Sequence, residues 1–289
     1  MDYTTSEWIN LIFRWVHVLA GIAWIGQTFL FNWFERHLPD DPLPEGTDPN
    51  VAGRLWMVHG GGFYQVEKQK TAKKLPNTLH WFKWESMLTV STGYVLLVVL
   101  YYMGGTMTDS MVMSLRDWQA LAPWWPFSAA SLPAAYSIIL IIIGWSVYDL
   151  LVSKTPVGTK DLYAALTFFP MVVALSYLLT NTLSGRAAFI QLGAMFGTIM
   201  VCNVWMRILP GQRRMLNAIE AGKEPDMSHG SRGKQRSMHN TFMVVPLVFL
   251  MLSNHFPLAA YGHGASQNWL WLSGFVLVGW IAAKFIRDH

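Results

Sequence analysis

The sequence predicts an all-α fold, a polytopic transmembrane bundle of about seven helices that forms a single domain over residues 1–289. Of these 289 residues, 53% are hydrophobic and only 13% are charged, whereas a soluble domain carries about 25% charged residues. Several apolar stretches reach the roughly 20 residues that are needed to cross a hydrocarbon core of about 30 Å. Lys and Arg gather in alternate loops, as is typical of multi-pass membrane proteins. The exterior is therefore expected to face lipid.

The expected spans follow one another along the whole chain, at residues 8–32, 78–103, 131–152, 161–180, 186–209, 239–257 and 267–286. Two long polar loops, 33–77 and 210–238, lie between them. The stretch 113–128 holds Trp118, Trp124 and Trp125 beside two prolines, a composition typical of a segment at the membrane interface. No internal repeat or low-complexity tract divides the chain, so one bundle is expected.

Positive charge orients the expected bundle. The two long loops hold most of the cations: Arg36, Arg54, Lys68, Lys70, Lys73, Lys74, Arg213, Arg214, Lys223, Arg232, Lys234 and Arg236. Cations on the same side of the membrane are Lys154, Lys160, Lys284 and Arg287, whereas the opposite loops offer Arg116 and Arg186. The positive-inside rule then places the N-terminus outside and both long loops in the cytoplasm.

Charge and cysteine content exclude several classes of protein. The net charge of +4 is small and the cations of the chain lie in loops. This favours a role of the cations in orienting the helices in the membrane over nucleic-acid binding. The single cysteine, Cys202, rules out an intrachain disulfide framework, a cysteine-based zinc site and a CxxCH haem attachment in this chain. The N-terminus, MDYTTSEW, lacks the basic region of a cleavable signal peptide, so the first apolar stretch is expected to remain as a span.

Polar side chains inside the expected spans form an outer layer. With a rise of 1.5 Å per residue, His17 lies near the midplane of the first span and one turn from Arg14. The layer comprises Arg14, His17, Gln191, Asn254 and His255. Such groups usually face a bundle interior or a cavity, which makes His17 a functional candidate. His255 can equally end a helix before Pro257.

A second polar layer is expected on the cytoplasmic side. Its members are His80, Lys83, Glu85, Asp149, Asn203, Arg207, His239 and Asn240, and the loop residues Arg54 and His59 can fold over the same mouth. Simpler readings stay open. Imidazoles at span ends can rest among lipid headgroups, Lys83 can snorkel to the interface, and Glu85 can form an ion pair within its own turn.

The imidazoles are candidate ligands of a metal or of haem b. A neutral imidazole in a helical bundle is a common axial ligand of haem iron. His17 and His255 form the outer candidate pair, and His80 and His239 the inner one. No short ligand motif such as HExxH supports either pair.

A glycine-rich stretch, MVHGGGFY at residues 57–64, lies in the first long loop. Successive glycines let the backbone approach a ligand closely, but the Lys-Ser/Thr of a phosphate-binding loop is missing. With His59 ahead of it, the stretch is either a lid over a small planar or anionic ligand or a tight turn.

Five segments together resemble a known family. They are RWVHVLAGIAWIG (14–26), MVHGGGFY (57–64), LHWFKWE (79–85), GRAAFIQLGAMFGTIMVCNVWMRILPGQ (185–212) and HNTFMVVPLVFLMLSNHFP (239–257). In this order they resemble the membrane domain of the bacterial membrane-bound urate oxidases, the urate hydroxylase PuuD family. The positions that match the family's motifs include Arg14, His17, His59, His80, Glu85, His239, Asn254 and His255.

The resemblance implies an integral protein of the bacterial inner membrane, usually of eight helices followed by a periplasmic cytochrome c domain. It implies oxidation of urate to 5-hydroxyisourate in purine breakdown, with electrons leaving through cytochrome c. This chain has no CxxCH, so haem c is expected only on a missing domain or a separate partner. An eighth helix would return the C-terminus to the periplasm.

On this reading we expect the cytoplasmic mouth to bind urate. Arg54 or Lys83 would hold the anion with His239 and Asn240, His59 or His80 would act as the base, and Glu85 would orient it. Electrons would cross to the outer layer, supported by Arg14, Gln191 and Asn254. Two alternatives are a haem-b electron-transfer subunit without substrate chemistry and an anion transporter with histidine proton relays.

Overall fold

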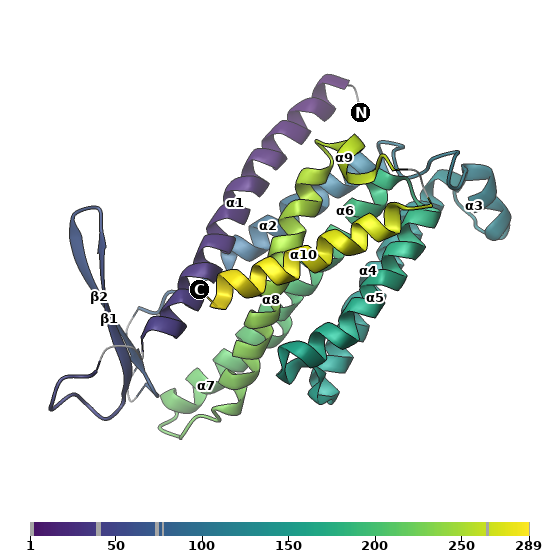
Figure 1. Cartoon of the computed structure of the whole chain (residues 1–289). Helices are drawn as coiled ribbons and strands as arrows, with labels where there is room; N and C mark the ends of the chain where they lie inside the picture. Colours follow the sequence, from purple (N-terminus) through teal and green to yellow (C-terminus); the bar gives the residue numbers. More distant parts are fainter. Residues whose placement is uncertain (1–2, 39–41, 73–74, 77, 264–265, 289) are drawn as a thin grey trace.

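The helices of a computed structural model follow the expected spans closely. The structure describes residues 3–38, 42–72, 75–76, 78–263 and 266–288, so Lys73 and Lys74 lie outside the described residues. The long helices are α1 (Tyr3–His37), α2 (Trp84–Leu97), α4 (Leu132–Lys154), α5 (Asp161–Thr182), α6 (Gly185–Cys202), α7 (Leu209–Glu220), α8 (Ser228–Ser253) and α10 (Asn268–Asp288). Short helices are α3 (Leu115–Leu121), α9 (Pro257–Tyr261), the π-helices η1 (Val98–Tyr102) and η4 (Asn203–Ile208), and the 3-10 turns η2 (Ala129–Ser131) and η3 (Pro156–Thr159). Figure 1 shows their arrangement.

Within the described residues, six helical segments are long and apolar enough to cross a membrane: 3–37, 84–102, 129–154, 161–182, 185–220 and 268–288. The prediction of a multi-pass helical bundle is therefore confirmed. The remaining expected span, 239–257, corresponds to the second half of α8. This helix is not among the six because its first half, from Ser228 to Thr241, is rich in polar residues.

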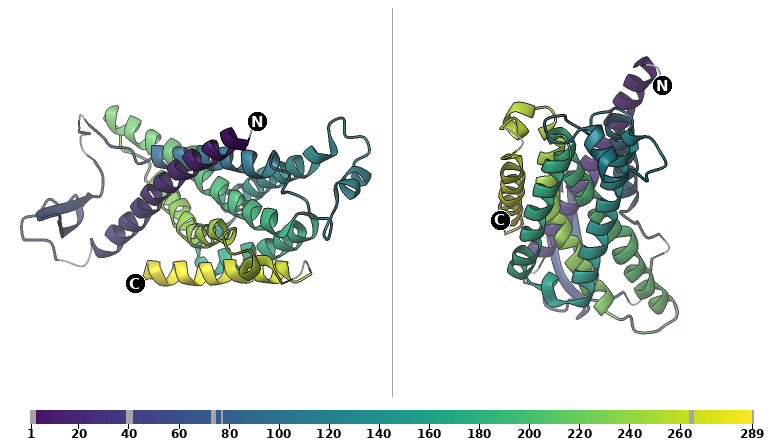
Figure 2. Two further views of the ribbon diagram at one scale, coloured as in Figure 1. Left: turned by 90° about the horizontal axis from the view of Figure 1, so that it is seen from above. Right: turned by 90° about the vertical axis from the view of Figure 1, so that its right-hand side faces the viewer.

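Helix α6 lies at the centre of the bundle. Every residue from Ala187 to Gly193 is buried, and the small side chains let neighbouring helices approach closely. Helix α1 is the opposite case, because its outer half exposes Leu11, Trp15 and Leu19. These side chains suit contact with lipid. Helix α10 forms one edge of the bundle, as both views in Figure 2 show.

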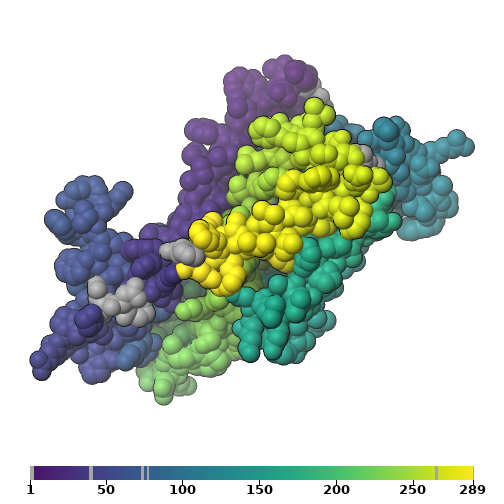
Figure 3. Space-filling view, in the orientation of Figure 1, coloured from purple at the N-terminus to yellow at the C-terminus, as the bar shows by residue number. Residues whose placement is uncertain are grey.

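The first long loop, 33–77, contains regular structure that was not predicted from the sequence. Helix α1 continues to His37, and strands β1 (Val51–His59) and β2 (Gly62–Gln69) form an antiparallel hairpin. Gly60 and Gly61 make its turn with φ of 57° and 81°, values that favour glycine in a two-residue hairpin turn. The hairpin forms a separate lobe beside the helices (Figure 3).

One close approach fixes the base of the hairpin. The backbone N–H of Arg54 donates to the Leu38 carbonyl at 3.1 Å, and a Cβ on Gly53 would lie 2.3 Å from that oxygen. Lys68 pairs with Glu35 at the end of α1. The hairpin is therefore attached to α1 rather than folded over the bundle.

The second long loop, 210–238, is also more ordered than expected. Helix α7 occupies its first part, and α8 begins at Ser228, well before the expected span. Pairing along α8 explains the early start, because Arg236 is buried against α4 and Lys234 pairs with Glu35 of α1. The expected interfacial segment 113–128 contains α3, which begins with a capping box made by Ser114 and Asp117.

Gly279 controls the packing of α10 on α8. A Cβ there would lie 2.8 to 2.9 Å from the Cβ, Cα and Cδ of Pro246, a residue that cannot adjust without moving the helix backbone. We expect Gly279→Ala to lower the thermal stability of the detergent-purified protein, because overpacking costs about 1–3 kcal/mol. Gly274→Ala on the same helix is the control, since nothing lies within 4 Å of its added Cβ. Equal melting temperatures for the two variants would contradict this account of the packing.

Candidate functional site

A buried hydrogen-bond network joins the C-terminal ends of α4 and α6 to the N-terminal half of α8. Asn203, at the start of η4, is completely buried at its centre. Its Nδ2 donates to Tyr148 Oη at 3.0 Å and to Asn240 Oδ1 at 2.9 Å. Its Oδ1 accepts from Arg236 at 3.1 Å, and Asn240 in turn donates to the Met200 carbonyl at 3.1 Å. Five expected inner-layer residues share this network: Asn203, Asn240, His239, Asp149 and Arg207.

Arg236 supplies a buried positive charge to this network. Its guanidinium lies 2.9 Å from Asp149 Oδ1 and donates to Ser153 Oγ at 2.8 Å. The same guanidinium lies 5.2 Å from the centre of the Tyr148 ring, where the ring face attracts a cation. Arg207 donates to both carboxylate oxygens of Asp149 from a more exposed position. The buried charge is thus paired and hydrogen-bonded, as buried charges require.

His239 is held through both ring nitrogens. Its Nε2 lies 3.1 Å from the Gly158 carbonyl, which can only accept, so Nε2 carries the proton. Its Nδ1 therefore accepts from the hydroxyl of Tyr148 at 2.8 Å. The glycine at position 158 leaves room for the imidazole of His239, because a Cβ there would lie 2.8 Å from the imidazole Cε1. The imidazole has no nitrogen left for a metal or haem.

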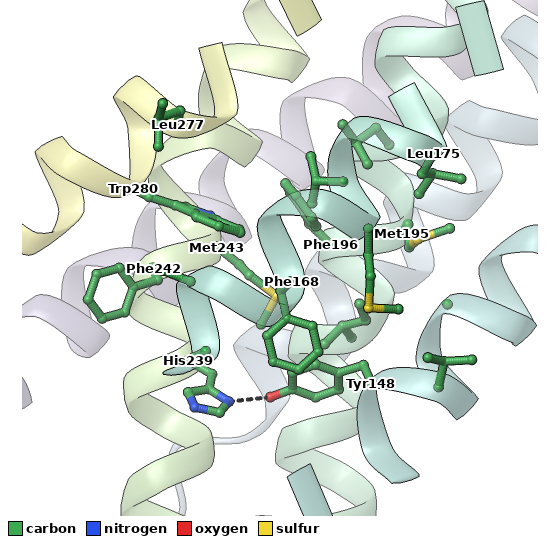
Figure 4. A pocket seen from close by; sticks show the side chains of 18 of the residues that line it. Tyr148, Phe168, Leu175, Met195, Phe196, His239, Phe242, Met243, Leu277 and Trp280 are labelled. Atoms are coloured by element: carbon green, nitrogen blue, oxygen red, sulfur yellow. Dashed lines mark hydrogen bonds between the residues drawn. The ribbon is translucent and has the colours of Figure 1, made fainter. Parts of the chain in front are cut away.

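An apolar cavity of about 600 Å³ adjoins the network between α4, α5, α6, α8 and α10. Figure 4 shows Tyr148 and His239 at one end of it, with Phe168, Met195 and Phe196 along its walls. Trp280 of α10 also lines it. The indole Nε1 of Trp280 is buried and has no hydrogen-bond acceptor, which is unusual because buried donors are nearly always paired.

A second, polar cavity of about 450 Å³ lies where the C-terminal ends of α1 and α10 meet the N-terminal half of α8. Its lining residues are Asn32, Glu35, Arg36, Lys234, Met238, Arg287 and Asp288. Glu35 pairs with Lys234 at 2.8 Å and Asp288 pairs with Arg287 at 3.0 Å. Arg36 donates to the Arg287 carbonyl at 2.9 Å, and no carboxylate among the described residues forms an ion pair with it. Three cations thus face two carboxylates.

The two cavities share one wall. The guanidinium of Arg287, which lines the polar cavity, lies 4.9 Å from the centre of the Phe242 ring, which lines the apolar one. It also donates to Asp161 at 2.6 and 3.2 Å, and Asp161 lines the apolar cavity. A single layer of side chains therefore separates a polar compartment from an apolar one.

The other residues expected at the cytoplasmic mouth are not brought together. Arg54 pairs with Glu67 across the hairpin at 2.5 Å, and His59 is exposed near the hairpin turn. The exposed His80 packs against Phe82, and Lys83 lies over the rings of Trp81 and Trp84. Glu85 accepts from Gln27 of α1 at 3.1 Å. The glycine stretch is a hairpin turn, the second of the two readings, and it covers no ligand site.

The outer layer is only partly assembled. Asn254 accepts from Tyr101 at 2.8 Å and from Arg186 at 3.1 Å. Gln191 is buried and donates weakly to Tyr102 at 3.4 Å, while its Oε1 has no partner. Arg14 binds Asn10 within its own helix. These contacts close the outer end of the bundle.

The candidate haem ligands differ in whether a ring nitrogen is available. His17 is half-buried between α1 and α2, where its Nδ1 donates to the Thr89 carbonyl at 2.8 Å. His255 is exposed after the end of α8. In the inner pair, His80 is exposed and His239 has both nitrogens engaged. The inner pair therefore does not fit a haem with two histidine ligands. Nowhere in the described part of the chain do three His, Cys, Asp or Glu side chains gather as a metal site.

Sequence reasoning missed several residues that define the two cavities. Arg36, Lys234 and Arg236 were used only to orient the bundle in the membrane, and Tyr148 and Trp280 were not singled out. Arg236 lies three residues before His239, which places both on one face of a helix. That spacing predicts a shared site for Arg236 and His239 only if the helix is known to include both residues, and the expected span began at residue 239.

Comparison with known proteins gives one match. A family model described as "Urate oxidase N-terminal" matches residues 3–289. No curated protein and no solved structure matches the chain.

Proposed function

The chain belongs to the urate oxidase N-terminal family, and we propose that it oxidises urate to 5-hydroxyisourate in the bacterial inner membrane. The electrons pass finally to a cytochrome c, either a further domain or a separate protein that carries the haem c. Urate plus water gives 5-hydroxyisourate, two protons and two electrons. The site must therefore bind a planar anion, admit water, accept protons and release an electron pair.

The polar cavity between α1, α8 and α10 is the observation that carries this proposal. Urate is a monoanion near neutral pH, and among the lining residues three cations face two carboxylates. Asp161 also pairs with Arg287, while Lys68 pairs with Glu35 and Lys284 pairs with Asp161 and Asp288, so the cluster keeps an excess of cations for the anion. Arg36 has no ion-pair partner among the described residues, and its planar guanidinium suits a ring with adjacent acceptors. Glu35 and Asp288 are the wall groups that can accept protons.

Asn32 adds hydrogen-bonding capacity to the same wall. Its Nδ2 donates to Thr241 Oγ1 at 2.8 Å, which leaves the amide oxygen to accept from a urate N–H. The apolar cavity suits urate poorly, because most carbonyl and N–H groups of the ring would be buried without partners there. Each such group costs about 1–3 kcal/mol.

The proposal predicts that urate is consumed by membranes that contain the chain, with one oxygen atom taken from water. Vesicles would receive urate, cytochrome c and ¹⁸O-labelled water, and mass spectrometry would follow the label. We expect one labelled oxygen in 5-hydroxyisourate and two cytochromes reduced per urate. Membranes without the chain are the control.

Other outcomes identify the alternatives. Urate that enters the vesicles unchanged indicates an anion transporter. A haem-b spectrum that does not respond to urate indicates an electron-transfer subunit. Either result, without product, would overturn the proposed oxidation.

A further inference from the structure

We propose that the apolar cavity binds an isoprenoid quinone, which takes the electron pair from urate before it reaches cytochrome c. Binding of the quinone is argued from the cavity alone, and its reduction by urate rests on the proposed function. The occupant must be mostly apolar, carry few hydrogen-bond acceptors and enter from the lipid. A quinone with a hydrocarbon tail has all three properties.

The cavity walls select an apolar ligand that comes from the membrane. The polar groups among its lining residues are few, and aromatic and aliphatic side chains fill the rest. Ile143 of α4, Leu162 of α5 and Ile281 of α10 line it and are also exposed on the outside of the bundle. These helices are membrane spans, so this exterior faces lipid tails. A ligand can therefore enter sideways without crossing water.

Two polar groups suit the oxygen atoms of a quinone ring. The Nε1 of Trp280 is covered by neighbouring atoms and has no acceptor, so it can donate to a ligand oxygen once the indole, which lines the cavity, turns toward the ligand. The hydroxyl of Tyr148 lies at the end of the cavity, where Asn203 donates to its oxygen and its proton goes to His239. This hydroxyl can turn its proton to a ligand oxygen while it keeps the hydrogen bond from Asn203. A lipid acyl chain offers no acceptor to either group.

A quinone in the apolar cavity would lie close enough to the polar cavity to accept electrons from urate bound there. Phe242 and Arg287 are in contact and line one cavity each. Urate in the polar cavity and a quinone in the apolar one would thus be separated by a single side-chain layer. No metal is needed to carry electrons over so short a path.

The overall step balances. Urate, water and quinone give 5-hydroxyisourate and quinol: urate loses two electrons and two protons, and the quinone gains two of each. Water supplies the new oxygen atom of the product. The quinol then leaves into the lipid, and its two electrons reduce two cytochromes c in later single-electron steps.

The binding test uses decylubiquinone and the full chain in lipid nanodiscs. Binding would be followed by equilibrium dialysis, with empty nanodiscs to correct for partition into lipid. We expect one saturable site per chain. Trp280→Phe keeps the ring and removes the donor, so it should weaken binding about 5- to 20-fold. Ala165→Phe fills the cavity from α5 and should abolish saturable binding.

Trp271→Phe is the matched control, because this tryptophan lies on the same helix and is exposed away from the cavity. It should bind decylubiquinone like the unmodified chain. Binding that Trp280→Phe and Ala165→Phe leave unchanged would overturn the site, as would the absence of saturation. Thermal melting of each variant shows whether a loss of binding reflects a loss of fold.

A second measurement separates this inference from the proposed function. If decylubiquinone binds at this site but urate does not reduce it, the quinone site stands and its role as acceptor fails. If urate is oxidised equally fast by Ala165→Phe with cytochrome c alone, electrons bypass the cavity and the acceptor role is overturned.

Discussion

Arg236→Met is expected to destabilise the folded protein by about 3–5 kcal/mol, the usual cost of breaking a buried ion pair by removing one partner. The side chain of Arg236 is 6% exposed, and that of Asp149 is 13% exposed. Without the guanidinium, Asn203 Oδ1 and Ser153 Oγ lose the hydrogen-bond donor that Arg236 supplies, and Asp149 keeps only the exposed Arg207 as its ion-pair partner. Unfolding in detergent, followed by tryptophan fluorescence, measures the change.

Arg207→Met provides a matched control on the same carboxylate. Its side chain is 47% exposed, and an ion pair with that exposure contributes at most about 1 kcal/mol. The two arginines therefore share a partner and differ in burial. If both variants lose the same stability, the network does not depend on burial of Arg236, and its description as a structural centre would be wrong.

The sequence predicts the spanning helices well because their signal is strong and local. A run of some twenty apolar residues has few alternatives in a membrane, and each expected span corresponds to a long helix, although the ends of several helices differ from the expected ones. The prediction fails where a helix continues into polar sequence. The start of α8 carries Arg and Lys because these side chains pair with α1 and α4, and such contacts between distant segments leave no local pattern.

The hairpin was missed for a related reason. Its strands contain Lys, Glu and Gln, and they face water on most sides, so no alternating apolar pattern marks them. The turn at Gly60 and Gly61 is a usable signal in hindsight, since two adjacent glycines between β-branched and aromatic residues favour a hairpin. The triple glycine was interpreted either as a lid over a ligand or as a tight turn, and neither reading included the strands on its two sides.

The sequence predicted at which depth the polar residues of the network lie, but not which of them are in contact. Depth along the helices grouped His239, Asn240, Asn203 and Asp149 correctly, because a rise of 1.5 Å per residue fixes depth well. Rotation about each helix axis decides which residues at one depth meet. The sequence does not predict how the segment that carries His80, Lys83 and Glu85 is rotated. In the structure these side chains face α1 or the surface rather than the network.

The charge of Arg36 provides the sharpest test of the urate site. Arg36→Met removes the one cavity cation without an ion-pair partner among the described residues, and we expect the KM for urate to rise about 10- to 100-fold. This equals about 1.4–2.8 kcal/mol, less than the roughly 4 kcal/mol that two charges 4 Å apart gain near a protein surface, because Arg36 is exposed to water. The kcat should change little if Arg36 binds substrate and transition state equally.

Arg36→Lys should recover part of the affinity, because it keeps the charge but loses the planar pair of donors. Arg213→Met on α7 is the control, since Arg213 is an exposed cation outside the cavity lining. Screening adds an independent readout: raising the salt concentration should weaken urate binding to the unmodified chain more than to Arg36→Met. A KM that Arg36→Met and Arg213→Met raise equally would mean that general surface charge attracts urate, and the anion site would then have to lie elsewhere in the bundle.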